Sequence, residues 1–252
     1  MMKSLEKKYK VSIVNYTNTL PFLYGLKHSF TSNEIEIVSD HPADCAKKLF
    51  NKETDIGLIP VSVLHSMNDY QIVTDFCIGS ENKVDSVSLY SQVPLHEIST
   101  ILLDYQSRTS VTLVRILCRE LWKISPQFLK GEIGFENNIK GKTAGVVIGD
   151  RTFHLKNKFE YTFDLAENWR NLTNLPFVFA CWVCTNKLSE EFLNKFNEAL
   201  KFGVSHTAEA VNTISGSILS KQEYNFYLTE RINYNFNTEK RAALKLFLEK
   251  LV

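Results

Sequence analysis

The sequence predicts an α/β protein built from two units, with a ligand-binding cleft between them. Strand-like apolar segments alternate with segments whose apolar residues recur at helical spacing, and this alternation begins again near Val93. The sequence shows no internal repeat and no low-complexity linker between the two series. Two α/β units without a linker are most simply joined by strands that pass from one unit to the other.

The first series predicts a mainly parallel sheet with helices on its faces. Pro21 opens the first helix, and Ser39 or Asp40 caps the second. Two further strand-like segments, residues 70–78 and 85–95, follow this series. The strands of the series itself are residues 10–16, 34–39 and 55–64, and its helices are residues 21–30 and 42–53.

The second series leads into a helical C-terminal part, in which Ser189 caps a helix with two glutamates in its first turn. We expect "SLYSQVPL" and "PFVFACWVC" to be the strands that cross between the units. This divides the chain into one domain of residues 1–92 plus 183–252 and an inserted domain of residues 93–182. The expected strands are residues 99–104, 143–150 and 175–184, and the expected helices are residues 111–124, 165–174, 190–204, 221–231 and 239–251.

The composition is that of an ordinary globular protein. The 252 residues carry a formal net charge of +1, with 44% hydrophobic and 23% charged residues. This near-neutral charge balance gives no sign of a basic surface that would bind nucleic acid or an anionic membrane. No apolar segment has the length of a membrane span. The N-terminal residues lack the apolar stretch of a secretory signal, so we expect a cytoplasmic protein with reduced thiols.

Two of the five cysteines form a CxxC pattern, at Cys181 and Cys184. Redox pairs need a helix N-terminus that lowers the thiol pKa, whereas this pair lies inside an apolar strand that turns the two residues to opposite faces. We therefore interpret both as structural thiols. With no second cysteine pair and no HxH or HExxH pattern, the sequence predicts no metal site, and it contains no GxSxG motif.

A polar stretch, "QSRTS" from Gln106 to Ser110, separates a predicted strand from a predicted helix. The N–H groups at a helix start have no partner within the helix and attract anions. Ser107, Thr109 and Ser110 add hydroxyl donors, and Arg108 adds a cation that can bind a carboxylate through two hydrogen bonds. The stretch is either an ordinary helix cap or a site for an anionic ligand. A nucleoside triphosphate is disfavoured because there is no Gly-rich P-loop.

Other polar positions lie at the ends of predicted strands, where ligands of α/β sheets bind. The loop "NYTNT", from Asn15 to Thr19, offers amide and hydroxyl groups, which are equally ordinary in a loop before a helix. Gly149 and Asp150 end a buried strand, and Asp150 could act as a base, orient a hydroxyl or cap a turn. Ser86 offers a hydroxyl near the expected crossing.

Five segments occur in this order: "NYTNTLPFLYGL", "DIGLIPVSVL", "DYQSRTSVTLVRIL", "AGVVIGD" and "DLAENWRNLTNLPFVFACWV". Taken together, they resemble the chorismate dehydratases of the futalosine route to menaquinone. The resemblance implies the type II periplasmic-binding-protein fold, with two α/β domains, two crossing strands and a cleft between the domains. Where that family commonly reads "SYLNT", this chain has Asn15 and Thr17 in place of Ser and Leu, and it keeps Asn18.

The resemblance also implies a reaction, in which chorismate loses water to give 3-[(1-carboxyvinyl)oxy]benzoate. Such a hydro-lyase needs no cofactor and no metal, because aromatisation of the ring drives the elimination. The proton goes either to a carboxylate of the substrate or to Asp150. The implied site consists of Asn18, which assists loss of the hydroxyl, and of substrate-binding groups at Ser86, Ser107–Ser110, Gly149 and Asp150.

Three other functions are compatible with this fold. A solute-binding protein would only capture a small anion. The sister enzyme of the pathway, acting on cyclic dehypoxanthine futalosine, would need a histidine base in the cleft. The effector domain of a transcription regulator would need a DNA-binding segment ahead of the first strand, where only about nine residues stand. In each case we expect a small-molecule ligand and closure of the cleft around it; the sequence predicts no oligomeric state.

Overall fold

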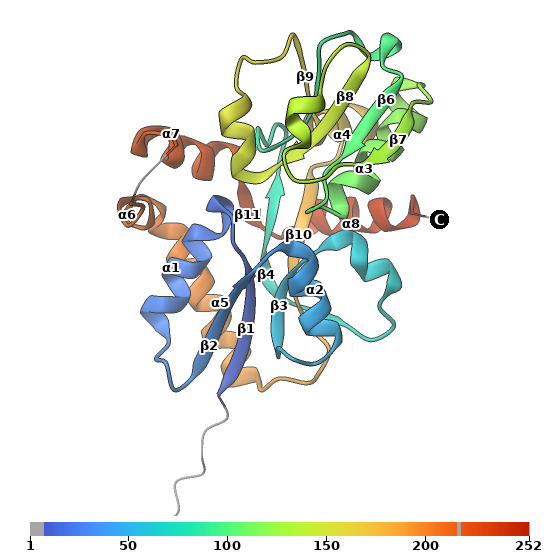
Figure 1. Ribbon diagram of the computed structural model, residues 1–252. Coiled ribbons are helices and arrows are strands. Elements are labelled where there is room, and N and C mark those ends of the chain that lie inside the picture. The colour runs from blue at the N-terminus through green and yellow to red at the C-terminus, as the bar shows by residue number, and fades with distance from the viewer. Residues whose placement is uncertain (1–7, 216–217, 252) are drawn as a thin grey trace, which may run out of the picture.

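The computed structural model describes residues 8–215 and 218–251, and its strands form two separate sheets (Figure 1). The first sheet has the order β11-β4-β10-β3-β1-β2 and the second has the order β7-β6-β8-β5-β9. The strands of the first sheet are β1 (Tyr9–Val14), β2 (Ile35–Asp40), β3 (Ile56–Pro60), β4 (Gln71–Ser80), β10 (Phe177–Cys184) and β11 (Asn233–Asn235). Those of the second are β5 (Val87–Ser91), β6 (Thr100–Leu103), β7 (Gln127–Lys130), β8 (Thr143–Ile148) and β9 (Tyr161–Asp164). We call the parts built on these sheets the first and second units.

Both sheets are mixed: the three strands of the first predicted series, β1, β2 and β3, pair in parallel as predicted, but antiparallel strands complete their sheet. β1 pairs in parallel with β2 and β3, and β6 pairs in parallel with β7 and β8. β4 leaves the first unit and β10 returns to it, so these two neighbours run antiparallel. β5 enters the second unit and runs antiparallel to β8 and β9 for the same reason.

The chain passes between the units at residues 81–86 and at residues 174–176. β5 and β10, the expected crossing strands, each lie within one sheet, and the short segments before them make the passage. Asp164 fixes the first passage because its carboxylate accepts the N–H groups of Val84 at 3.0 Å and Asp85 at 2.7 Å. The same carboxylate caps the following helix, α4 (Leu165–Thr173). The domain boundaries at 92/93 and 182/183 stay a prediction, and the pairing changes from one sheet to the other several residues before each of them.

Helices α1 (Leu20–Ser29) and α5 (Glu190–Ser205) pack together on the first sheet at very short range. A Cβ atom on Gly25 would lie 2.0 Å from the carbonyl oxygen of Ala199. Only glycine permits this approach. Ser189 caps α5 as predicted, because its hydroxyl accepts the Phe192 N–H.

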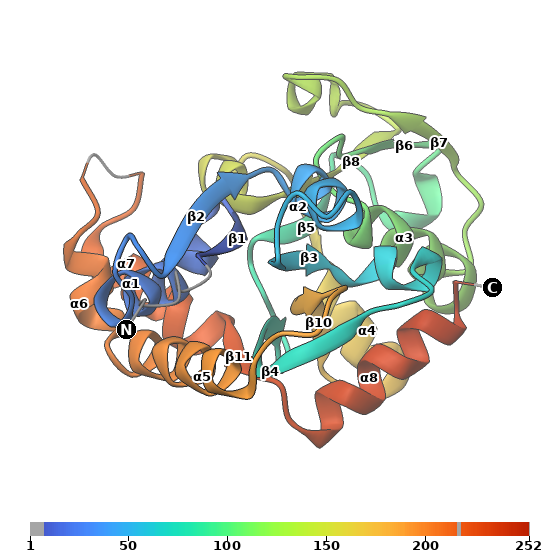
Figure 2. The same cartoon turned by 90° about the horizontal axis from the view of Figure 1, so that it is seen from below.

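The other helices of the first unit are α2 (Pro42–Phe50), α6 (Thr207–Asn212), α7 (Lys221–Phe226) and α8 (Thr238–Glu249). The predicted cap of α2 is wrong: His41 is the N-cap residue and no side chain caps the helix. Asp40 instead forms an ion pair with Lys48, at 2.7 Å. Seen from below, α8 runs beside β4, and α5 lies to the left of β4, near α1 (Figure 2).

In the second unit, α3 (Thr109–Leu117) continues into a π-helical turn at Cys118–Trp122. The short elements β7, β9, β11 and α6 were not anticipated from the sequence. Across the described residues, none of the helices combines the length and the apolar character that a bilayer crossing requires.

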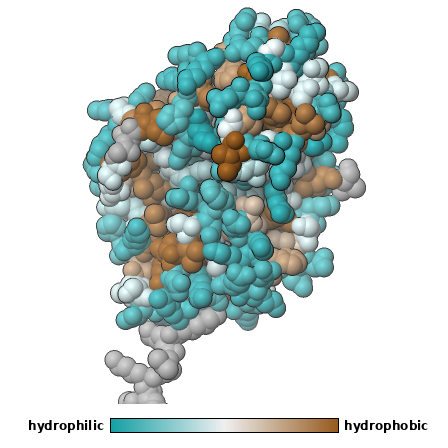
Figure 3. All heavy atoms as spheres, viewed as in Figure 1, coloured by the Kyte–Doolittle hydropathy of each residue, from teal (hydrophilic) through white to brown (hydrophobic). Residues whose placement is uncertain are grey.

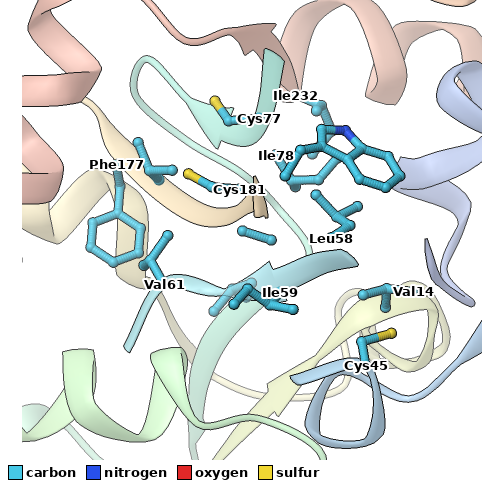
Figure 4. Packing of buried hydrophobic residues seen from close by; sticks show 14 of the residues in the cluster. Val14, Cys45, Leu58, Ile59, Val61, Cys77, Ile78, Phe177, Cys181 and Ile232 are labelled. Carbon is cyan, nitrogen blue, oxygen red and sulfur yellow. The ribbon is translucent and has the colours of Figure 1, made fainter. Parts of the chain in front are cut away.

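The buried core is continuous from the first sheet to the second. Figure 4 shows part of it, with Cys77 and Cys181 on the paired strands β4 and β10. Cys181 and Cys184 are buried free thiols on a strand, which confirms their structural interpretation. On the face seen in Figure 3, hydrophobic side chains form separate patches among hydrophilic ones.

Candidate active site

A cleft between the two units holds about 590 Å³ of space free of protein atoms, part of which is open to solvent. Both sheets contribute to its walls, which are mainly apolar, with a few amide and hydroxyl groups. Six of the eight residues proposed from the sequence line it, and two do not. The lining residues are Val14, Tyr16, Asn18, Thr19, Pro42, Leu58, Pro60, Ile78, Val84, Ser86, Val87, Ser107, Thr109, Ser110, Ile148, Gly149, Phe179 and Ala180.

The start of α3 opens onto this cleft, as the position of "QSRTS" predicted. The Ser107 hydroxyl oxygen accepts the N–H of Ser110, in the first turn of the helix, at 3.0 Å. The Thr109 hydroxyl lies 3.3 Å from the hydroxyl of Ser62, a contact that joins the two units. The Ser110 hydroxyl faces the cleft and has no hydrogen-bond partner among the residues that the structure describes. The helix start therefore offers donors to a ligand.

Arg108 does not belong to the lining. It is the N-cap residue of α3, its side chain is exposed, and it lies outside the cleft. Sequence spacing cannot tell which side of the first turn faces a ligand. The hydroxyl groups of Ser107, Thr109 and Ser110 line the cleft, whereas the Arg108 guanidinium does not.

Asp150 does not line the cleft either. Both of its carboxylate oxygens lie 3.2 Å from the Thr17 nitrogen, whose N–H they accept. Burial raises the pKa of Asp150, and the hydrogen bonds from Thr17 partly offset this rise. The carboxylate therefore holds the "NYTNT" loop of the first unit against the second unit.

Asn18 lies in a short 3₁₀ turn, Thr17–Thr19, between β1 and α1. The Thr19 hydroxyl donates to the carbonyl oxygens of Val14 and Tyr16, both at 2.8 Å. Tyr234 of β11 donates its hydroxyl to the Asn18 carbonyl oxygen at 2.9 Å. These bonds fix the backbone of the turn, so the Asn18 side chain is held at the cleft wall.

Ser86 ends the first passage between the units and is buried. Its carbonyl oxygen accepts the N–H of Gly149 at 2.8 Å. Its hydroxyl oxygen accepts a hydrogen bond of 2.7 Å from the phenol of Tyr227. The sequence had given no reason to connect Ser86 with Tyr227, because 141 positions separate them.

Tyr16 is a second residue that sequence reasoning missed. Its hydroxyl reaches across the cleft and donates to the Gln106 side-chain oxygen at 2.7 Å. Its ring lies against Gly149, where a Cβ atom would stand 2.8 Å from the ring carbon Cε1. Because Gly149 has φ of +68°, glycine suits this position both for its backbone conformation and for the room it leaves.

An ion pair between Asp104 and Arg151 holds the loop that carries Gln106 in position. The Asp104 carboxylate accepts the Arg151 guanidinium at 2.5 Å, the Gln106 N–H at 2.9 Å and the Ile148 N–H at 3.0 Å. Glu136 binds the other terminal nitrogen of Arg151 at 2.5 Å. Burial raises the pKa of Asp104, while Arg151 lowers it. The network ties the loops after β6 and β8 together, and it fixes the partner of Tyr16.

No lysine, arginine, histidine, aspartate or glutamate occurs among the lining residues. Within residues 8–215 and 218–251 there is also no group of three His, Cys, Asp or Glu side chains that could hold a metal ion. The cleft can therefore offer a ligand neutral donors, the N-terminus of α3 and apolar contact.

A model of the family described as menaquinone biosynthesis matches residues 9–252. The chain belongs to this family. Two curated relatives of this menaquinone-biosynthesis protein carry the name chorismate dehydratase. The one from Thermus thermophilus is 23% identical and the alignment covers 97% of this chain and 96% of the relative. The one from Campylobacter jejuni is 26% identical, with 94% of each chain covered.

Solved structures show the same fold for this family member. A protein from Archaeoglobus fulgidus superposes with a TM-score of 0.75 at 16% identity, over 96% of both chains. The periplasmic aliphatic sulphonate binding protein of Escherichia coli has a TM-score of 0.60 at 15% identity, over 98% of this chain and 91% of that one. The fold is thus the periplasmic-binding-protein fold, as the sequence resemblance implied.

Proposed function

We propose that this protein is a chorismate dehydratase, a hydro-lyase that converts chorismate to 3-[(1-carboxyvinyl)oxy]benzoate. One observation carries the proposal. Asn18, Ser86 and the start of α3 line the same mainly apolar cleft, and no lining residue has a charged side chain. Membership of the menaquinone-biosynthesis family and two relatives named chorismate dehydratase support it.

The start of α3 binds one carboxylate of the substrate. Ser107, Thr109 and Ser110 surround the helix N-terminus, where unpaired N–H groups and the helix dipole favour an anion. Neutral donors in a mainly apolar cleft can hold a carboxylate well, because little water competes for it. Arg108, exposed and outside the lining, is not part of this site.

The proton acceptor is a carboxylate of the substrate. No lining residue is a carboxylate or an imidazole, and both Asp150 oxygens already accept the Thr17 N–H. The ring carbon that loses its proton carries the enolpyruvyl ether. The carboxylate of that ether can reach the proton through a six-membered cyclic arrangement. Proximity of this kind lowers barriers by about 7–11 kcal/mol at best.

The elimination balances without any other reactant. The ring C–H bond breaks and its electrons form the new ring double bond, while the neighbouring C–O bond breaks. The proton taken by the substrate carboxylate passes to the departing hydroxyl, which leaves as water. Asn18 and Ser86 donate hydrogen bonds to the departing oxygen as negative charge develops on it, and one donor placed in this way contributes about 10²–10³-fold.

The test is to mix the purified protein with chorismate alone and to follow loss of substrate and formation of the aromatic benzoate by absorbance and mass. We expect Asn18→Ala to lower kcat by about 10²-fold. The matched control is Asn15→Ala, since Asn15 lies three residues earlier in the same loop with an exposed side chain. A wild-type protein that leaves chorismate unchanged would refute the proposal.

A solute-binding function is the second candidate, because the cleft holds no side-chain base and the fold is shared with the sulphonate-binding protein. Tight binding of chorismate without turnover in the same assay would favour it. The sister enzyme is not favoured, since no histidine lines the cleft.

A further inference from the structure

One buried phenol hydrogen-bonds Ser86, one of the two residues that we place at the departing hydroxyl. Tyr227 begins the π-helical turn that follows α7, far from both in sequence. Its hydroxyl donates to the Ser86 oxygen at 2.7 Å, and the Asn18 side chain acts on the same phenol by lowering its pKa. The C-terminal part of the chain therefore supplies a hydrogen-bond partner to a side chain of the cleft wall.

The position of this phenol is fixed by packing. Tyr227 is 4% exposed and Ser86 is 1% exposed. The Tyr227 ring meets Phe153 edge to face, with centroids 5.1 Å apart and an interplanar angle of 81°. Burial raises the pKa of the Tyr227 phenol well above its ordinary value, so the group stays protonated and remains a donor.

The phenol has a single hydrogen, which sets the direction of this hydrogen bond. Tyr227 gives its hydroxyl hydrogen to Ser86. Ser86 has accepted a bond from Tyr227, so its own hydrogen is free to point into the cleft.

We propose that Tyr227 is a positioning residue that orients the Ser86 hydroxyl, so that Tyr227 and Ser86 form a directed chain of donors ending on the departing hydroxyl of the substrate. This inference rests on the proposed function. Hydrogen bonds in such a chain polarise one another, so the Ser86 hydroxyl becomes a stronger donor than an isolated serine. Tyr227 acts through Ser86 and does not touch the substrate itself.

The test is a double-mutant cycle of Tyr227→Phe and Ser86→Ala, with kcat and KM for chorismate measured separately. We expect Tyr227→Phe to lower kcat about tenfold, the effect of one net hydrogen bond, and to change KM by less than about twofold. In the Ser86→Ala background the same substitution should lower kcat no further. The matched control is Tyr224→Phe, since Tyr224 is equally buried, lies one turn earlier and also meets Phe153; it should leave both constants unchanged.

Three results would overturn the inference while leaving the proposed function intact. Equal losses of kcat in the two backgrounds would show that Tyr227 does not act through Ser86. A change in KM alone would show a role in binding only. An equal loss of kcat in Tyr224→Phe would show a general effect of removing a buried hydroxyl. Wild-type protein without dehydratase activity would instead refute the proposed function, and this role with it.

Discussion

Replacing Gly149 with alanine tests whether the Tyr16 loop must lie against the second unit. Gly149 has φ of +68°, and a Cβ atom there would stand 2.8 Å from Tyr16 Cε1 and 3.0 Å from Cδ1. Cβ atoms in proteins do not approach a ring carbon so closely, so the ring must move away. That movement would also break the 2.7 Å hydrogen bond between Tyr16 and Gln106.

Two effects lower the stability of the Gly149→Ala variant. A non-glycine residue in the left-handed region costs about 1–2 kcal/mol. Displacing a packed ring costs about 1–3 kcal/mol more. The control is Gly141→Ala, because Gly141 has φ of +54° and no atom within 4 Å of an added Cβ. Gly141→Ala should therefore show the backbone cost alone.

Urea titration measures the free energy of unfolding, and steady-state turnover of chorismate measures the activity of the site. We expect Gly149→Ala to lower the unfolding free energy by about 2–5 kcal/mol. We also expect it to lower kcat/KM by at least about tenfold, because the displaced Tyr16 side chain no longer forms part of the cleft wall. In a Tyr16→Leu background, Gly149→Ala should cost no more stability than Gly141→Ala. Equal losses in Gly149→Ala and Gly141→Ala, with kcat/KM unchanged, would refute the reasoning.

Three further changes have distinct expected outcomes. Arg108→Ala should alter the KM for chorismate less than about twofold in steady-state assays, because an exposed charge outside the lining contributes little. Gly25→Ala should lower the urea unfolding free energy by about 3 kcal/mol, since its Cβ would overlap the Ala199 carbonyl oxygen and push α1 from α5. Burial raises the pKa of Cys77 and Cys118 to about 12. At pH 8 these thiols should react with a disulfide reagent much more slowly in native protein than in urea-unfolded protein, and equal rates would contradict their burial.

Local signals were sufficient for the longer elements and for the start of α3. Ser189 before two glutamates marks a helix start by itself, and its hydroxyl does accept the Phe192 N–H. The stretch from Ser107 to Ser110 could be placed at the cleft because it follows a strand of a sheet whose loops gather at one edge. In both cases the relevant contacts are close in sequence or follow from the order of strands.

Contacts between distant segments could not be predicted. Asp40 was a reasonable cap by residue type, but a favourable ion pair with Lys48 engages its carboxylate. Asp150 was a reasonable base by position, but its oxygens turn to the Thr17 N–H of the opposite unit. Tyr227 carried no signal at all, because a tyrosine on a C-terminal helix is ordinary until folding brings it beside Ser86.

Because the cleft lining has no charged side chain, short-range hydrogen bonds must provide most of the affinity for an anionic substrate. A formal net charge of +1 gives the protein almost no long-range field, and no lining residue is a cation. Affinity for a dianion must then come from short-range donors at the start of α3, which salt screens little. We therefore expect kcat/KM for chorismate to fall less than about threefold between 0.05 M and 0.5 M salt. A steep fall would show that a cation outside the lining, with exposed Arg108 the nearest in sequence, reaches the ligand after all.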